Sequence, residues 1–126
     1  MTRYFGFAFS AAMLPPGDIT LAKRDVSAEA VIALLEEGYV SCLNPSHKET
    51  IQAAHSRFGL NVQVPETAPR VILQPGDEMI VMQVTGLPRL TDQHEYTAEQ
   101  IQSAQFVFVL VRLWTDQEAF LYSHSH

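Results

Sequence analysis

The segment Phe106-Val107-Phe108-Val109-Leu110-Val111-Arg112-Leu113-Trp114 is the strongest strand signal in the chain. It is rich in the β-branched and aromatic residues that pack well on a pleated surface. A second segment, residues 4–9 near the N-terminus, is apolar on both of the faces that it would present as a strand. A strand of that kind lies in the interior of a sheet. The protein is therefore expected to be built around a β-sheet.

Two helices are predicted between these strands. Ser27 caps the first helix, which continues to Gly38 and is followed by a short strand over residues 39–43. The second helix covers residues 46–58 and ends at Gly59, where a left-handed residue commonly stops a helix.

The second half of the chain adds a hairpin and a third helix. Residues 70–73 and 78–84 are predicted as paired strands, joined by a turn at residues 74–77 whose Pro-Gly centre suits type II geometry. Thr97 with Gln100 forms a capping box that opens a short helix reaching about Ala104.

These elements predict an α+β fold with the order βαβα-hairpin-αβ. The sheet is expected to be mixed, with about five strands, and the helices to pack mainly on one side of it. Residues 1–114 are assigned to a single domain and residues 115–126 to a C-terminal tail. A sheet of this kind leaves an exposed edge or face, so a homodimer that covers it is plausible.

Composition narrows the classes of function. With 126 residues the chain suits one domain, and its formal charge of −6 argues against a general binder of duplex nucleic acid. No apolar run approaches the ~20 residues that cross a bilayer, so no membrane partner is expected. Cys42 is the single cysteine, which excludes an internal disulfide and fits a cytoplasmic location.

The candidate site lies in Asn44-Pro45-Ser46-His47-Lys48-Glu49-Thr50. Ser46 followed by Glu49 reads as a capping box, which places His47 and Lys48 on the first turn of the second helix. The free N–H groups and the dipole of that turn favour an anion, and an imidazole there can hold a phosphate and protonate it. The alternative is that His47 is an inert surface residue, because short motifs of this kind also occur without function.

Other chemistry is not expected. Asp92, His94 and Glu95 form a metal-like cluster on a predicted loop, but the cluster lacks a second partner group, so no metal site is assigned. The chain has no phosphate-binding glycine loop, no Gly-x-Ser-x-Gly elbow and no paired cysteines. No cofactor is therefore predicted.

In its element order and motifs the chain resembles a family of small viral and bacterial proteins that includes the ring nucleases of type III anti-CRISPR. The family was first described as uncharacterised proteins of archaeal viruses. The resemblance covers about residues 4–114. Its markers here are Ala8-Phe9-Ser10 with Met13-Leu14, Ser46-His47-x-x-Thr50, Gly76-Asp77-Glu78, Arg89 and the terminal strand ending in Trp114.

The resemblance implies a homodimer whose interface binds cyclic tetra-adenylate and cleaves it without a metal. A ribose 2′-OH would attack the adjacent phosphate, and His47 falls on the family histidine that protonates the leaving oxygen. Asp92 falls where the family carries a glutamate. Arg89 and Ser10 match ligand-contacting positions, and Ser46, Lys48 and Thr50 complete the expected ligand-binding set.

Two departures leave a second function open. The family flanks the serine with asparagines, whereas Phe7 and Ala12 occupy those places here, so two hydrogen-bonding groups for the ligand are missing. The alternative to a ring nuclease is a non-catalytic homodimeric module that binds a cyclic nucleotide or a protein partner.

Overall fold

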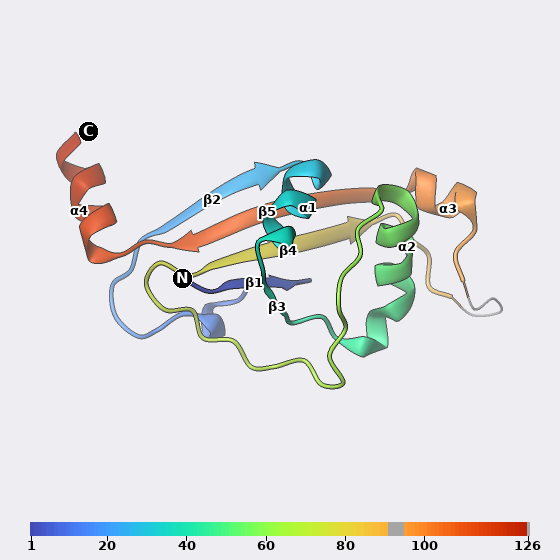
Figure 1. Ribbon diagram of the computed structural model, residues 1–126, viewed down its shortest axis with the longest axis horizontal. Coiled ribbons are helices and arrows are strands. Elements are labelled where there is room, and N and C mark those ends of the chain that lie inside the picture. Colours follow the sequence, from blue (N-terminus) through green and yellow to red (C-terminus); the bar gives the residue numbers. More distant parts are fainter. Residues whose placement is uncertain (91–94, 126) are drawn as a thin grey trace.

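The computed structural model describes residues 1–90 and 95–125 and folds them around one five-stranded sheet (Figure 1). The strands follow the order β2 (Leu21–Val26), β5 (Gln105–Leu113), β4 (Glu78–Thr85), β1 (Arg3–Gly6) and β3 (Val40–Ser41). Strands β3, β1 and β4 run parallel to one another, whereas β5 is antiparallel to both β4 and β2. The predicted mixed α+β sheet is confirmed.

Among the described residues, four α-helices and two short 3₁₀ turns accompany this sheet. The helices are α1 (Ala28–Glu36), α2 (Lys48–Phe58), α3 (Ala98–Ser103) and α4 (Asp116–Ser125), and the turns are η1 (Ala11–Met13) and η2 (Pro45–His47). In the part of the chain that the structure describes, no helix combines the length and apolarity that a bilayer crossing requires.

The main core lies between the sheet and helices α1 and α2. Phe5, Ile80 and Leu110 stand opposite one another on β1, β4 and β5 and so form a row across one face. All three are buried, and the cluster that they join includes Val31 of α1 and Ile51 of α2. Both helices therefore cover the same face, as the apolar spacing of their residues predicts.

The opposite face carries a second, smaller cluster. Val71, Leu73 and Leu113 are its buried members, and Tyr4 and Met13 pack against them. The backbone N–H of Leu73 donates to the carbonyl of Met13 at 2.7 Å, which ties the irregular segment before β4 to the turn η1. This face, opposite the one that α1 and α2 cover, is thus covered by extended chain and a 3₁₀ turn.

The predicted hairpin is wrong in its first strand. Residues 70–73 form no strand in the structure, and β4 pairs instead with β1 and β5. The turn itself is present, because the N–H of Asp77 donates to the carbonyl of Gln74 at 2.9 Å and Gly76 has φ +93°. The fifth strand is β2, an edge strand that the sequence analysis did not identify.

The helix ends confirm several predicted caps. The hydroxyl of Ser27 accepts a hydrogen bond from the N–H of Ala30, and Gly59 ends α2 in the left-handed conformation with φ +73°. Thr97 and Gln100 form the reciprocal bonds of a capping box at the start of α3. Each of these caps is formed by residues close together in the sequence, so the starts of α1 and α3 and the end of α2 can be predicted from the sequence alone.

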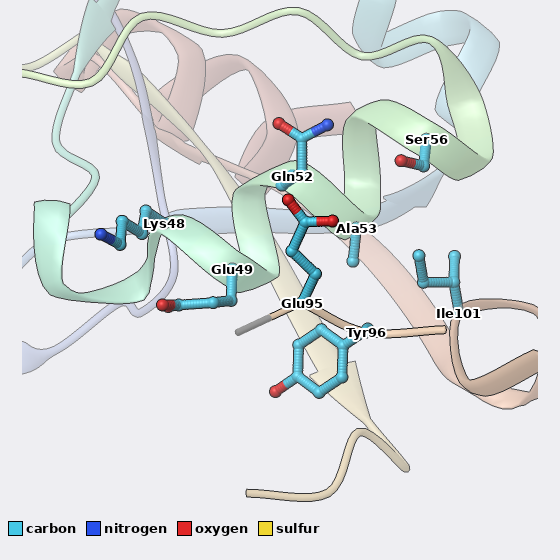
Figure 2. Close-up of a pocket in the computed structure, with 8 residues that line it drawn as sticks. All are labelled: Lys48, Glu49, Gln52, Ala53, Ser56, Glu95, Tyr96 and Ile101. Carbon is cyan, nitrogen blue, oxygen red and sulfur yellow. The ribbon is translucent and has the colours of Figure 1, made fainter. Parts of the chain in front are cut away.

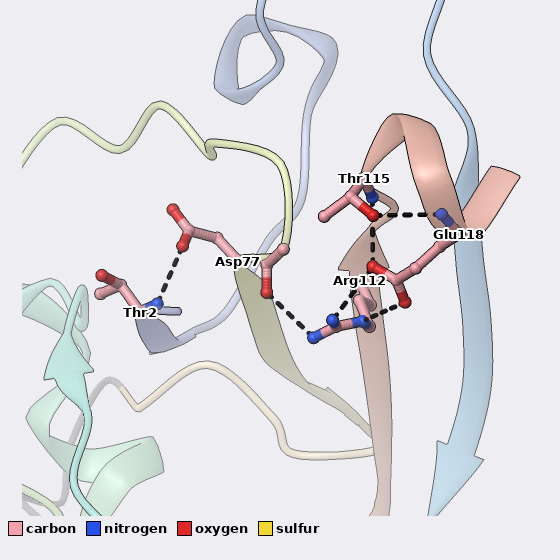
Figure 3. A network of polar contacts seen from close by, with 6 residues as sticks. Thr2, Asp77, Arg112, Thr115 and Glu118 are labelled. Atoms are coloured by element: carbon pink, nitrogen blue, oxygen red, sulfur yellow. Dashed lines mark hydrogen bonds and ion pairs between the residues drawn. The ribbon is translucent and has the colours of Figure 1, made fainter.

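Residues 115–126, predicted as a tail, form helix α4 over Asp116–Ser125. Its first turn is held by Glu118, whose carboxylate accepts from the guanidinium of Arg112 at 3.1 and 3.2 Å (Figure 3). Arg112 also donates to the carbonyl of Gly76 at 2.9 Å. Further along α4 the Tyr122 ring meets the Trp114 ring edge-on, at 5.1 Å between centroids.

Acid is expected to break the ion pair that joins the first turn of α4 to Arg112 of β5. Hydrogen bonds from Arg112 and from the backbone of Thr115 lower the pKa of Glu118. A carboxyl whose pKa is lower in the folded state contributes stability above its unfolded pKa and loses it as the pH falls through the folded value. Trp114 is the single tryptophan, so its fluorescence should change below about pH 4, near the ordinary carboxyl pKa. In Glu118→Gln this acid transition should vanish, and a transition unchanged in that variant would contradict the assignment.

Candidate functional site

A cavity of about 570 Å³ opens beside His47 at one end of the sheet. We call it the His47 cavity. Its lining comes from the residue after β1, from η2, α2 and β4, and from the segments that follow β4. It consists of Phe7, His47, Thr50, Met82, Gln83, Val84, Thr85, Leu87 and Tyr96. The volume lies in the range of ligand-binding pockets, about 300–1,000 Å³.

The sheet topology explains why the cavity lies there. Strands β1, β3 and β4 run parallel, so their carboxyl ends meet at the same edge of the sheet. Phe7 follows β1 directly, His47 lies in the turn and helix start after β3, and Thr85 ends β4. The carboxyl ends of parallel strands are the usual location of ligand sites in open sheets.

His47 stands at the junction between η2 and α2. It is the last residue of the 3₁₀ turn and the N-cap of α2, and its side chain makes no capping bond. The side chain of Asn44 instead accepts from the N–H of Ser46 at 2.9 Å. The predicted capping box of Ser46 and Glu49 is therefore wrong, because the Asn44 bond and Pro45 start a 3₁₀ turn before the α-helix begins. His47 precedes the first turn of α2, and Lys48 begins it.

Phe7 packs against the imidazole of His47. The two rings meet edge to face, with centroids 5.3 Å apart and planes at 71°. Phe7 is half-buried and also contacts the main core, whereas His47 is exposed. An aromatic ring anchored in this way limits the orientations of the imidazole and leaves its nitrogens open to a ligand.

A second cavity of about 390 Å³ lies along α2 (Figure 2). We call it the Lys48 cavity, and it is lined by Lys48, Glu49, Gln52, Ala53, Ser56, Glu95, Tyr96 and Ile101. Lys48, Gln52 and Ser56 are spaced four residues apart on α2 and so share one side of that helix. The structure therefore places Lys48 in a cavity next to that of His47, while Thr50 shares the His47 cavity.

Tyr96 borders both cavities, and its position is fixed by the start of α3. It directly precedes the capping box of Thr97, and Ile101 lies at the helix position that packs against such a residue in a hydrophobic staple. The far end of α3 is held by Arg57 of α2, whose guanidinium donates to the carbonyls of Ile101 and Ala104. The C-terminal end of α3 is thereby fastened to α2.

The remaining predicted residues are not brought into these two cavities. Ser10, Ser46 and Arg89 are exposed and are absent from the lining of both. Ser10 precedes η1, whose Met13 packs on the opposite face of the sheet from α2. Asp92 and His94 lie outside the described residues.

The two cavities differ in charge. His47 is the only titratable side chain besides Tyr96 in the lining described for the His47 cavity, whereas Glu49 and Glu95 stand beside Lys48 in the other. Within residues 1–90 and 95–125 no three metal-ligating side chains gather as a metal site would require. In the His47 cavity a phosphate would therefore meet an imidazole that can donate a proton. The described lining holds no carboxylate that would repel it.

Sequence reasoning missed Tyr96. The signal was present, because Tyr96 and Ile101 flank the Thr97 box at the two positions of a hydrophobic staple. Such a staple fixes the direction in which the chain approaches a helix, and here it holds an aromatic ring between two cavities. His55, the other histidine of this region, is exposed and lines neither cavity.

Comparison with known proteins supports the fold. No protein-family model matches the chain, and no match is found among curated proteins. Among solved structures, B116 of Sulfolobus turreted icosahedral virus superposes with a TM-score of 0.68 at 20% sequence identity, over 91% of this chain and 100% of that one. At this identity the likeness concerns the fold alone. The chain thus shares the fold of a protein from an archaeal virus.

Proposed function

We propose that this protein is a metal-independent ring nuclease that cleaves a cyclic oligoadenylate, with cyclic tetra-adenylate as its substrate. The observation that carries the proposal is the position of His47, exposed in a cavity of about 570 Å³ at the carboxyl ends of parallel strands. An imidazole so placed is accessible to a phosphodiester and is oriented by the ring of Phe7.

The proposed reaction needs one acid and a positioned phosphate. The ribose 2′-oxygen forms a bond to the adjacent phosphorus, and the bond from phosphorus to the 5′-oxygen breaks. His47 gives its proton to that 5′-oxygen, and the proton of the 2′-OH passes to water. The products are a 2′,3′-cyclic phosphate and a free 5′-hydroxyl. General acid catalysis of this kind contributes about 10²–10⁴-fold in rate.

Neighbouring side chains support the role of His47. The Thr50 hydroxyl lies in the same cavity and can hydrogen-bond a phosphate oxygen, and Lys48 supplies a cation one residue along the chain. In this proposal Asp92, Arg89, Ser10 and Ser46 act on the ligand when two copies form a homodimer. A two-fold axis between the copies presents one His47 from each to a symmetric ring.

A second candidate function is favoured by Phe7. Its ring stands against His47, where the related family carries a hydrogen-bonding asparagine. That exchange replaces a polar contact to the ligand by an apolar one, which suits a module that binds a cyclic nucleotide without cleaving it.

Calorimetry followed by chromatography separates the two functions. The purified protein is titrated with cyclic tetra-adenylate in EDTA, and the mixture is then resolved after incubation. The nuclease binds and converts the ring into linear products. Binding with an intact ring would establish the second function, and the absence of binding would exclude both functions for this ligand.

A further inference from the structure

Helix α4 presents an exposed apolar surface at its centre, where Phe120 and Leu121 are 58% and 56% exposed. Asp116 and His124 are also exposed and lie four residues before and after Phe120, so these three residues share one side of the helix. The rings of Phe120 and His124 stack with their centroids 4.0 Å apart, and Nδ1 of His124 donates to the carbonyl of Phe120 at 2.8 Å. We call Asp116, Phe120, Leu121 and His124 the outer stripe of α4.

The opposite side of α4 is attached to the rest of the protein, which fixes the direction of the outer stripe. Thr115 and Glu118 exchange hydrogen bonds between side chain and backbone at the helix start, and Arg112 holds the Glu118 carboxylate (Figure 3). Tyr122, four residues after Glu118, meets the ring of Trp114. Glu118 and Tyr122 lie across the helix from Phe120, so the helix is held with its outer stripe directed away from these contacts.

The outer stripe lies at the other end of the sheet from the His47 cavity. Helix α4 follows the carboxyl end of β5, which is antiparallel to β4, and the carboxyl end of β4 lines that cavity. Figure 1 shows α4 at the end of the sheet that is distant from α2. A contact through the outer stripe is therefore separate from any dimer that forms around His47.

The order of chemical groups along the outer stripe is complementary to itself. If two copies of α4 pack antiparallel about a two-fold axis at Phe120, the two Phe120 rings meet at the axis. Asp116 of each copy then stands opposite His124 of the other, because both residues lie four positions from the axis. An imidazole next to a carboxylate takes up a proton readily, so each of these two pairs can form a salt bridge. The antiparallel arrangement also brings opposite ends of the two helix dipoles together.

We propose that the outer stripe of α4 is a self-association surface, on which a second copy of the chain docks its own α4 in the antiparallel direction. Phe120 is the anchor of this contact, and Asp116 and His124 set its direction. A ten-residue helix is about 15 Å long, so the contact is smaller than a standard interface of ~1,600 Å². The association is therefore reversible and depends on protein concentration. This inference is independent of the proposed function.

Sedimentation velocity over a range of protein concentrations tests the anchor. Phe120→Ser should weaken self-association by at least about 30-fold, the effect of losing a central aromatic residue from an interface. Because Phe120 is exposed, this variant should fold as the parent does, which circular dichroism checks.

Ile72→Ser is the matched control, because Ile72 is also a large apolar residue, is 45% exposed and lies outside α4. It should sediment as the parent protein does. Equal sedimentation of the parent and Phe120→Ser at every concentration would overturn the proposal, and so would equal losses of association in Phe120→Ser and Ile72→Ser.

Exchanging the charges tests the antiparallel direction. Asp116→Lys places cations opposite each other, and His124→Asp places carboxylates opposite each other. Each variant alone should therefore associate more weakly than the parent in low-salt buffer at about pH 6. An equimolar mixture should recover association, because the new lysine of one variant faces the new aspartate of the other, while Asp116 and His124 still face each other. A mixture that sediments as the sum of the two separate variants would overturn the proposed arrangement.

Discussion

Replacing His47 by alanine is expected to slow cleavage of cyclic tetra-adenylate by about 100- to 10,000-fold, the usual contribution of a general acid. The affinity for the ring should fall far less, because the neighbouring polar groups remain. The fold should also remain, since the imidazole is exposed and its described ring contact is with Phe7. Single-turnover rates and calorimetric affinities measure the two effects separately.

His55 provides the matched control for this experiment. It lies on α2, the helix that His47 precedes, is exposed, and lines neither the His47 cavity nor the Lys48 cavity. Its contribution to the end of α2 is a backbone carbonyl, which accepts from Gly59 at 2.8 Å and is retained in alanine. His55→Ala should therefore cleave at the parent rate. Equal rates in His47→Ala and His55→Ala would remove His47 from the mechanism.

The largest effect on stability is expected at the ion pair of Arg3 and Glu78. The two residues stand opposite each other on β1 and β4, and their side chains are only 9% and 8% exposed. The guanidinium also donates to the carbonyl of Leu34 at 2.7 Å, which ties α1 to the sheet. Arg3→Met leaves the Glu78 carboxylate buried without its cation, and the free energy of unfolding should fall by about 3–5 kcal/mol.

Urea unfolding of the parent protein and three variants tests this expectation. The double variant Arg3→Met with Glu78→Met removes both charges and should recover most of the loss. Lys23→Met is the control, because the Lys23–Asp25 pair on β2 is 62% and 73% exposed. Exposed pairs contribute about 0–1 kcal/mol, so this variant should unfold near the parent midpoint. An Arg3→Met midpoint equal to that of Lys23→Met would contradict the buried-pair account.

Local signals in the sequence predicted much of the fold. The cap at Ser27, the box at Thr97 and the glycine stop at Gly59 are set by bonds within a few residues, so tertiary packing did not displace them. The apolar run of β5 was also recognised, because most of its side chains are buried on one face of the sheet or the other and are therefore apolar. Features of this kind can be read without knowledge of the tertiary structure.

The errors arose where the same pattern suits two structures. Val71 and Leu73 are buried and Ile72 is exposed, an alternation typical of a strand. Here it belongs to extended chain that covers the sheet. Strand β2 carries Lys23, Arg24 and Asp25 and is mostly exposed, as an edge strand allows, so no apolar signal marked it.

The candidate site was only partly predictable for a related reason. Thr50 lines the cavity of His47 because it lies in the first turn of α2, directly after His47, whereas Lys48 lines the adjoining cavity. Ser10 belongs to a segment that packs on the face of the sheet opposite α2. No pattern within a few residues of Ser10 predicts that position. Tyr96 is close to the site only through the packing of α3 on α2, which Arg57 secures.

The most direct test of the proposed chemistry is ³¹P NMR of cyclic tetra-adenylate incubated with the protein in EDTA. Attack by the 2′-OH places the product phosphorus in a five-membered 2′,3′-cyclic phosphate, whose resonance is distinct from that of a ring phosphodiester. The account predicts that this resonance grows as the phosphodiester signal declines. A spectrum that stays that of the intact ring, or one in which the first product is a terminal monophosphate, would contradict it.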